Sequence, residues 1–145
     1  MKKIIILSFL FVPFALLMSN TSKDVAKENF ITGVQQSKTT GEKIFKKYCI
    51  SCHMADGSGV PHMNPPLIQT KYVLGEKEDL IKIILNGIGN VEINGETYTN
   101  KMPPLKKILK DQQIADVLTY VRKSFGNKAP AVTVTEVKAV RSKNT

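Results

Sequence analysis

The stretch of this chain that most restricts its fold and chemistry is a pair of cysteines three positions apart, followed directly by a histidine. It reads Cys49-Ile50-Ser51-Cys52-His53. In a C-x-x-C-H run the two thiols are spaced to add across the two vinyl groups of one porphyrin edge, and the adjacent imidazole can bind the iron. One short segment would then hold a haem by three bonds.

The same cysteine spacing also occurs in zinc sites, thioredoxin-like redox motifs and disulfides. A zinc site needs four ligands, and His62 as the fourth would crowd them all into fourteen residues. A thioredoxin-like site should lie within alternating strands and helices, and no such alternation is visible. A disulfide across so short a loop would constrain the chain little. Haem attachment is therefore favoured, with zinc and a disulfide as the alternatives.

The N-terminus predicts export. Lys2 and Lys3 precede fifteen residues, 4–18, that are apolar except for Ser8 and Pro13. This run is shorter than the about 20 residues of a membrane span, so residues 1–19 are interpreted as a signal peptide, with an uncleaved N-terminal anchor as the alternative. The expected location is the periplasm, either soluble or tethered to the membrane. Exported thiols normally pair as disulfides, and thioethers to haem are the better use for thiols so close together.

The charge of the chain argues against nucleic acid as a partner. The net charge is +9, but residues 39–127 hold twelve Lys and Arg against nine Asp and Glu. There are no arginine clusters with interleaved aromatic residues, the pattern of nucleic acid binding. An acidic protein surface or an anionic membrane is the expected partner.

Periodicity predicts a mostly helical domain with one hairpin. Residues 20–38 lack sustained periodicity and are interpreted as a linker, after which Thr39 and Thr40 are expected to cap a helix that leads into Cys49. Two further helices are expected over residues 76–86 and 111–125, each followed by glycine. Residues 91–98 alternate around Asn94-Gly95, which is typical of a hairpin.

The last part of the chain, residues 128–145, is a C-terminal extension. Thr133 and Glu136 resemble a capping box before a short helix that runs through Arg141, and a disordered basic tail is the alternative.

Two loops are expected to face the cofactor. Residues 54–72 form a long loop rich in Gly and Pro, which makes sense if it wraps a flat apolar group. Leu67 and Ile68 are expected to pack on the ring. A proline carbonyl of this loop can accept a hydrogen bond from the second ring nitrogen of His53.

The second loop carries Met102, which is followed by Pro103 and Pro104. A methionine in so rigid a turn does not serve as a flexible gap filler, so it is predicted to be the sixth ligand of the iron. Tyr98 is either a packing residue or a hydroxyl donor to a haem propionate.

Together these features resemble the class I, mono-haem cytochromes c of the exported bacterial type, over residues 39–141. The matching motifs are Gly41-x3-Phe45-x3-Cys49-Ile-Ser-Cys52-His53, Asn64-Pro65-Pro66-Leu67, Asn94-Gly95-x2-Tyr98-x3-Met102-Pro103-Pro104 and Gln113-Ile114-Ala115-Asp116-Val117-Leu118-Thr119-Tyr120-Val121-Arg122.

The resemblance implies an all-α cytochrome c fold around one haem c, here with the one small hairpin. Thioethers are expected at Cys49 and Cys52, with His53 as the proximal and Met102 as the distal ligand of the iron. The family's proline carbonyl, twelve residues after the haem histidine, falls on Pro65.

The chain departs from the family pattern at three positions. Met54 stands where the family often has glycine. Lys110 takes the place of the usual Ser or Thr cap, so Asp111 is expected to cap the helix. Met63 is a rival to Met102 that lies too close to His53 in sequence to reach the opposite face easily.

With both axial positions filled by His and Met, the iron has no open position for a substrate, so an electron carrier is expected rather than an enzyme. Redox proteins with an acidic docking face are the expected partners. The lysines around Met102 are either the docking site or a merely solvated face; they are Lys101, Lys106, Lys107 and Lys110. The alternatives are a cytochrome subunit of a larger exported dehydrogenase or reductase and a zinc-binding module.

Overall fold

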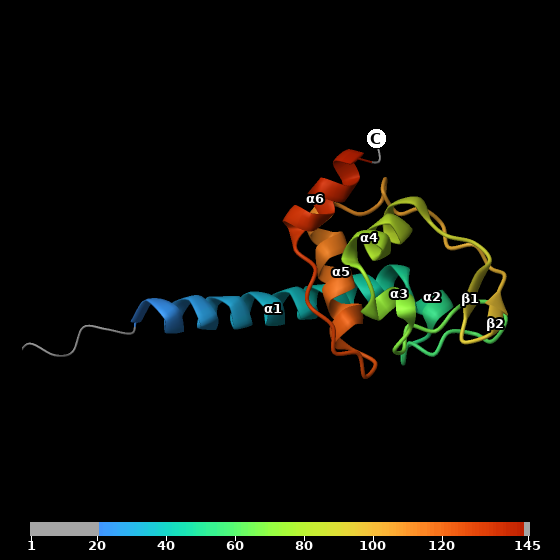
Figure 1. Cartoon of the computed structure of the whole chain (residues 1–145), viewed down its shortest axis with the longest axis horizontal. Coiled ribbons are helices and arrows are strands. Elements are labelled where there is room, and N and C mark those ends of the chain that lie inside the picture. Colours follow the sequence, from blue (N-terminus) through green and yellow to red (C-terminus); the bar gives the residue numbers. More distant parts are fainter. Residues whose placement is uncertain (1–20, 144–145) are drawn as a thin grey trace, which may run out of the picture.

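A computed structural model describes residues 21–143 of the chain, so the predicted signal peptide at residues 1–19 lies outside the described residues. Six helices and one hairpin follow in the order α1 (Thr21–Tyr48), α2 (Ile50–His53), α3 (Lys71–Leu74), α4 (Lys77–Asn86), β1 (Val91–Ile93), β2 (Glu96–Tyr98), α5 (Asp111–Lys123) and α6 (Val134–Lys143). Figure 1 shows α1 running past α5 and projecting from the rest of the molecule. The predicted helical architecture with one small hairpin is confirmed.

The helices α1 and α5 form the most extensive contact between elements. They approach so closely at Gly41 that a Cβ atom there would overlap the carbonyl oxygen of Asp116 and lie 2.7 Å from Cβ of Tyr120. One turn later the ring of Phe45 packs on that of Tyr120, with centroids 5.4 Å apart. This contact between the first and last long helices of the domain fixes where the C-terminal end of α1 lies.

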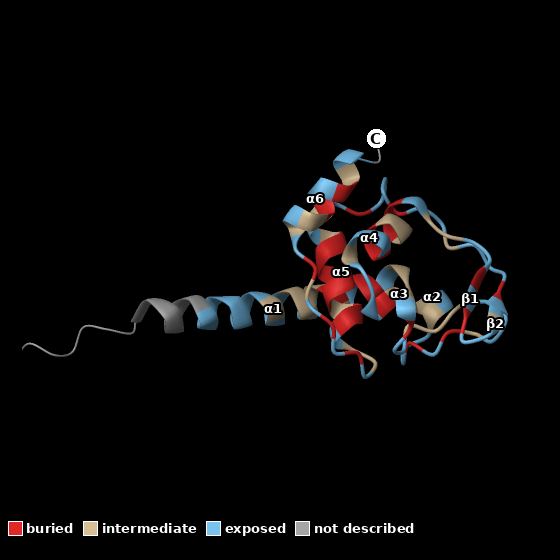
Figure 2. Ribbon diagram, viewed as in Figure 1, coloured by how far each residue is buried: buried red, intermediate tan, exposed pale blue. Residues whose placement is uncertain are grey.

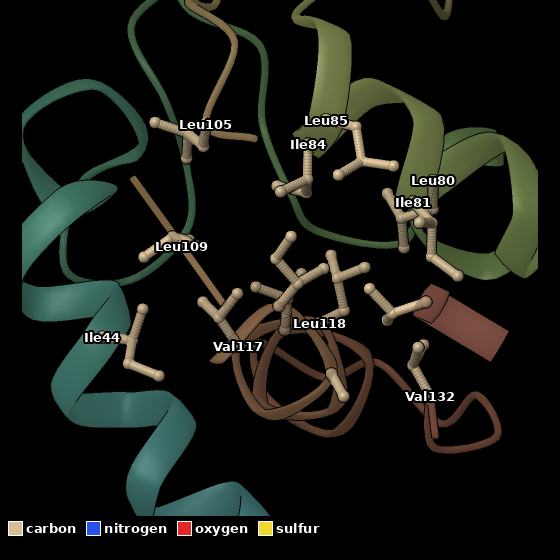
Figure 3. Packing of buried hydrophobic residues seen from close by; sticks show 14 of the residues in the cluster. Ile44, Leu80, Ile81, Ile84, Leu85, Leu105, Leu109, Val117, Leu118 and Val132 are labelled. Atoms are coloured by element: carbon tan, nitrogen blue, oxygen red, sulfur yellow. The ribbon is translucent and has the colours of Figure 1, made fainter. Parts of the chain in front are cut away.

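The buried side chains form one main cluster in which α5 is central (Figures 2 and 3). Ile114, Val117 and Leu118 of α5 are at most 2% exposed. The helix α4 contributes Leu80, Ile81, Ile84 and Leu85, and the segment before α5 contributes Leu105 and Leu109. Because α4 and α6 also pack on each other, the core holds together elements from most of the chain.

The expected start of the first helix is wrong. Residues 21–38, interpreted as a linker, belong to α1, and the hydroxyl of Thr39 donates to the carbonyl of Gln35 instead of capping a helix. The exposed residues in this part of α1 show no apolar periodicity, but a helix anchored by α5 can propagate cheaply through residues without proline. Ser37 already contacts the domain, since its hydroxyl donates to Asp116 over 2.6 Å.

The helix ends after residue 76 largely follow their predicted signals. Gly87, with φ 76°, follows the end of α4, and the hairpin turns at Asn94 and Gly95 with φ 54° and 81°. The helix α6 opens with the predicted box, in which the Thr133 amide donates to Glu136 over 2.7 Å and the Glu136 amide donates back over 3.3 Å.

The cap of α5 differs from expectation. Asp111 is the first helical residue and Lys110 holds the N-cap position, where its amide donates to the side chain of Gln113 over 3.0 Å. Asp111 therefore does not cap the helix, and its carboxylate is bound by Arg141.

Candidate functional site

The helix α1 delivers the cysteine and histidine motif to the edge of an apolar cavity. Cys49 follows the last residue of α1, and Ile50–His53 form the single turn of α2. The amide of His53 donates to the Cys49 carbonyl over 3.0 Å, which closes this turn. Cys49 and His53 both line the cavity, whereas Cys52 is exposed at its margin and is not a lining residue.

The cavity resembles a cofactor site in its lining, because a mostly apolar pocket with a few polar groups is typical of ligand sites. Its walls come from all parts of the domain and are almost entirely apolar; they include Phe45, Leu67, Tyr72, Val73, Leu80, Ile84, Ile88, Val91, Ile93, Val117, Leu118 and Val121. A flat apolar group such as haem fits these walls better than a charged or hydrated ligand does.

The ring of His53 is oriented by a backbone carbonyl. Its Nδ1 lies 2.9 Å from the carbonyl oxygen of Pro65, so Nδ1 carries the proton and donates, and Nε2 is left as the free lone pair. Burial lowers the pKa of His53, although the Pro65 carbonyl partly opposes this effect. A neutral imidazole with a fixed tautomer is the form that binds a metal ion. The hydrogen bond expected at Pro65 is thus present.

The two cysteines are free thiols in the structure, so the disulfide alternative finds no support. Burial, and to a smaller extent Cys52, raises the pKa of Cys49 to about 11. A thiol with so high a pKa is a poor nucleophile at neutral pH, unlike the reactive cysteine of a thioredoxin-like site.

The alternative of a zinc site also lacks a suitable cluster of ligands. Across residues 21–143 no three His, Cys, Asp or Glu side chains gather into a group that could hold a metal ion. His62 is directed elsewhere, since its Nδ1 lies 3.1 Å from Oε1 of Glu96.

Met102 lines the same cavity as His53, and its rival does not. Met63 is 49% exposed and is not a lining residue. Two backbone hydrogen bonds with Ile88 hold Met102: its amide donates over 2.8 Å and its carbonyl accepts over 3.2 Å. The sequence analysis did not predict that Ile88 pairs with Met102. The position of Ile88 between Gly87 and Gly89 was the one signal in the sequence.

Hydrogen bonds join the loop that follows His53, residues 54–72, to Thr99 and Asn100, which precede Met102. The Asn100 amide donates to the Met63 carbonyl over 3.0 Å, and its side chain donates to Asn64 over 3.1 Å. The Thr99 amide donates to the carbonyl of His62 over 3.2 Å. Of these residues, Asn100 also lines the cavity.

The remaining expected cavity residues divide into two groups. Leu67 lines the cavity, and the buried side chain of Asn127 donates to its carbonyl over 2.9 Å. Ile68 was expected to pack on the ring but is 42% exposed and is not a lining residue. Pro65, Pro66 and Leu67 all line the cavity, and the chain bends away at residues 68 and 69, where Gln69 has φ 49°.

Of the two roles left open for Tyr98, the structure shows the packing contact. Its ring packs with Val91 and Ile93, and its hydroxyl donates to Glu96 over 2.7 Å. The carboxylate of Glu96 raises the pKa of Tyr98. Tyr72, which sequence reasoning did not single out, lines the cavity, and Tyr98 does not.

The structure places a C-x-x-C-H turn on the wall of an apolar cavity. A carbonyl orients its histidine, and a methionine lines the same cavity. These features define a c-type haem protein. The family model described as "Cytochrome c" matches residues 39–125. The chain belongs to the cytochrome c family, whose members bind haem c covalently and transport electrons, so it is an electron carrier.

The chain is also similar to individual proteins. It is 35% identical over 124 residues, 84% of its length, to the alcohol dehydrogenase (quinone) cytochrome c subunit of Gluconacetobacter polyoxogenes. It is 31% identical over 140 residues, 89% of its length, to the gluconate 2-dehydrogenase cytochrome c subunit of Pantoea cypripedii. The matched regions span only 26% and 32% of these two subunits.

A smaller relative is cytochrome c-551 of Bacillus subtilis. It is 33% identical over 90 residues, which are 59% of this chain and 78% of that protein.

Proposed function

We propose that the chain is an exported mono-haem cytochrome that passes single electrons between redox proteins, with the iron held between His53 and Met102. The observation that carries the proposal is that these two side chains line one apolar cavity, which Cys49 also lines. Haem c supplies the exchange of one electron between the ferrous and ferric states of its iron.

The surrounding residues favour electron transfer over catalysis. With the His53 imidazole and the Met102 thioether as its ligands, the iron would have no open position for a substrate. The thioether would stabilise ferrous iron, and the apolar walls would disfavour the additional charge of the ferric state. We therefore expect a carrier with a positive reduction potential.

The axial role of Met102 is tested by replacing each methionine of the two loops in turn. In the oxidised wild type we expect a weak sulfur-to-iron charge-transfer band near the red end of the visible spectrum. Met102→Ala should remove this band, lower the potential and admit cyanide to the ferric iron. Met63→Ala is the matched control and should preserve the band. Loss of the band in Met63→Ala, with retention in Met102→Ala, would show that the assignment of the ligand is wrong.

The basic surface near Met102 supports docking to an acidic partner. Lys101, Lys106, Lys107 and Lys110 are all exposed, and none of them forms an ion pair within residues 21–143. By contrast, Lys46, Lys77 and Lys82 elsewhere on the surface are each paired with a carboxylate. Unpaired charges are the ones available for steering a partner.

Export is proposed from the sequence of residues 1–19. Within residues 21–143, no helix has both the length and the apolar character needed to cross a membrane. Fractionation of cells that express the full chain, with N-terminal sequencing of the mature protein, distinguishes a cleaved signal peptide from an anchor.

A second candidate is that the chain works as the cytochrome subunit of a larger exported dehydrogenase. The similarity to cytochrome subunits of alcohol and gluconate dehydrogenases favours this possibility. Purification of the native holoprotein under mild conditions tests it, because a subunit should elute together with a dehydrogenase and a free carrier should elute alone.

A further inference from the structure

The C-terminal helix α6 lies beyond the residues that the cytochrome c family model matches. One of its side chains nevertheless contacts residues 102–109, which we call the Met102 segment. Arg141 donates from one terminal nitrogen to the carbonyl of Lys106 over 2.8 Å and from the other to the carbonyl of Leu109 over 2.9 Å. Its Nε donates to Asp111 over 2.5 Å. The guanidinium thus spans a whole turn of this segment.

The turn and Met102 are mechanically linked. Only two prolines separate Met102 from Leu105, and proline fixes one of the two soft backbone angles of each residue. The amides of Ile108 and Leu109 both donate to the carbonyl of Leu105, over 3.0 and 2.9 Å, so the turn is closed. Leu105 and Leu109 are buried in the core (Figure 3). A displacement of the turn is therefore passed on to Met102.

The opposite edge of the segment is held by α4 and the residues after it. The amide of Leu105 donates to the carbonyl of Ile84 over 2.9 Å, and Met102 is paired with Ile88 through two backbone hydrogen bonds. The Met102 segment lies between these contacts and Arg141. Without the Arg141 contacts, its remaining hydrogen bonds to other elements within residues 21–143 would be those with Ile84 and Ile88.

Arginine is suited to this position because its planar fork presents several donors in a fixed geometry, whereas lysine presents one compact charge. The remaining attachments of α6 do not involve Arg141. Val137 and Val140 are buried in the core, and Glu136 is paired with Lys77 of α4 over 2.8 Å. Changing Arg141 should thus loosen the Met102 segment while α6 stays docked.

We propose that Arg141 is a positioning residue for Met102: the contacts of its guanidinium with Lys106, Leu109 and Asp111 restrain the Met102 segment and so set how often the sulfur leaves the iron. This inference rests on the axial role of Met102 proposed above.

The experiment uses the full-length holoprotein and two measurements. The first is the rate of cyanide binding to the ferric protein at cyanide concentrations where the rate no longer rises, because release of Met102 then limits it. The second is amide hydrogen exchange at Met102 and Leu105 in the reduced protein. Arg141→Ala should raise the limiting rate about tenfold, since hydrogen bonds made by charged groups are lost, and should speed exchange at both amides.

Lys77→Ala is the matched control, because it removes another charged attachment of α6 without touching the Met102 segment. It should leave both measurements near the wild-type values. Arg141→Lys keeps a charge beside Asp111, but its single nitrogen cannot replace the three nitrogens that reach Asp111, Lys106 and Leu109, so it should resemble Arg141→Ala. Equal effects of Lys77→Ala and Arg141→Ala, no effect of Arg141→Ala, or full recovery with Arg141→Lys would each overturn the proposal.

The sulfur-to-iron band of the wild type, read together with the two measurements, separates this inference from the proposed function. If the wild type lacks the sulfur-to-iron band, the axial role of Met102 fails and the proposed control of its release fails with it. If the band is present and Arg141→Ala leaves amide exchange and cyanide binding unchanged, only the role of Arg141 fails.

Discussion

The loop that presents His53 and the segment that presents Met102 face the same cavity, but the structure holds them differently. His53 lies one turn after α1, and its ring is fixed by Pro65, twelve residues further along the chain. Met102 belongs to no helix, and its segment is fixed by Ile84, Ile88 and Arg141, which come from other parts of the chain.

This difference separates what each side is expected to control. The contacts of His53 itself are local, since they are made with Cys49 and Pro65, so damage there should affect attachment of the cofactor. On the Met102 side the contacts are long-range and shared among elements, so damage there should affect how firmly the sulfur is held. The following changes test this division.

The largest effect is expected on the His53 side. His53→Ala should leave the attached haem five-coordinate or abolish its attachment altogether, because ligation and covalent attachment occur in the same turn. Optical spectra of the purified protein, with pyridine haemochrome analysis, measure both outcomes. An unaltered low-spin spectrum in His53→Ala would show that another residue is the proximal ligand.

The next effect is expected on the Met102 side, at Gly87. This residue has φ 76° and ψ 176°, and a Cβ atom there would overlap the carbonyl oxygen of Met102 and lie 3.1 Å from the nitrogen of Pro104. Gly87→Ala should lower the free energy of unfolding by about 2–4 kcal/mol and weaken the sulfur-to-iron band, because strain and overlap act together. Denaturant titration and the oxidised spectrum measure these changes.

Gly95→Ala is the control for Gly87→Ala. Gly95 also has a positive φ, 81°, but a Cβ atom there would have no neighbour within 4 Å. It should cost about 1 kcal/mol and leave the band intact. A band weakened equally in both variants would mean that Gly87 acts through general stability and not through Met102.

The sequence predicts the two sides unequally. The C-x-x-C-H motif and the proline count are short-range patterns, so the contact of His53 with Pro65 could be expected from them. Met102 stood out because of the prolines beside it, but nothing near it in sequence indicates what holds it. Arg141 lies 35 residues from Lys106, and its contacts depend on how α6 docks.

The helices and the hairpin likewise could be predicted only where the signal lies in their own residues. The helices α4 and α5 and the hairpin carry their own periodicity and stop signals and could be predicted. The early part of α1 has no apolar face of its own, so only its continuity with the anchored part makes it helical. The prediction that Ile68 packs on the ring rested on its apolar character, and the bend at residues 68 and 69 that exposes it has no signal in the sequence.

The third effect concerns the surface of the Met102 side. Reversing Lys106 and Lys107 to Glu should slow oxidation of the reduced protein by ferricyanide about tenfold at low salt, because the anion is no longer attracted to that surface. The difference should shrink as the ionic strength approaches ~0.15 M. Stopped-flow absorbance over a salt series measures it.

The control reverses Lys123 and Lys128, which are exposed at the other end of α5 and change the net charge equally. The 13 residues of α5 place Lys123 about 20 Å from Lys110, and Lys128 follows beyond the end of the helix. Equal slowing by both pairs would show that only net charge matters and that the surface around Met102 has no special role.

The smallest effect returns to the His53 side. Met54 follows α2 with φ 62° and ψ 163°, a conformation that side chains rarely adopt, and it is 44% exposed. Met54→Gly should relieve about 1–3 kcal/mol of backbone strain and lose roughly 0.5–1 kcal/mol to the flexibility of glycine in the unfolded chain. We therefore expect a net gain of about 1 kcal/mol in the free energy of unfolding, measured by denaturant titration of the holoprotein.

Met63→Gly makes the same chemical change at a residue of similar exposure, 49%, that does not have a positive φ. With no strain to relieve, it should destabilise the holoprotein by roughly 0.5–1 kcal/mol. The opposite signs of the two changes are the test, since a general effect of shortening an exposed methionine would move both variants the same way. If Met54→Gly is also destabilising, the backbone strain at Met54 does not cost the holoprotein free energy. The haem bonds of the neighbouring Cys52 and His53 would then stabilise this conformation.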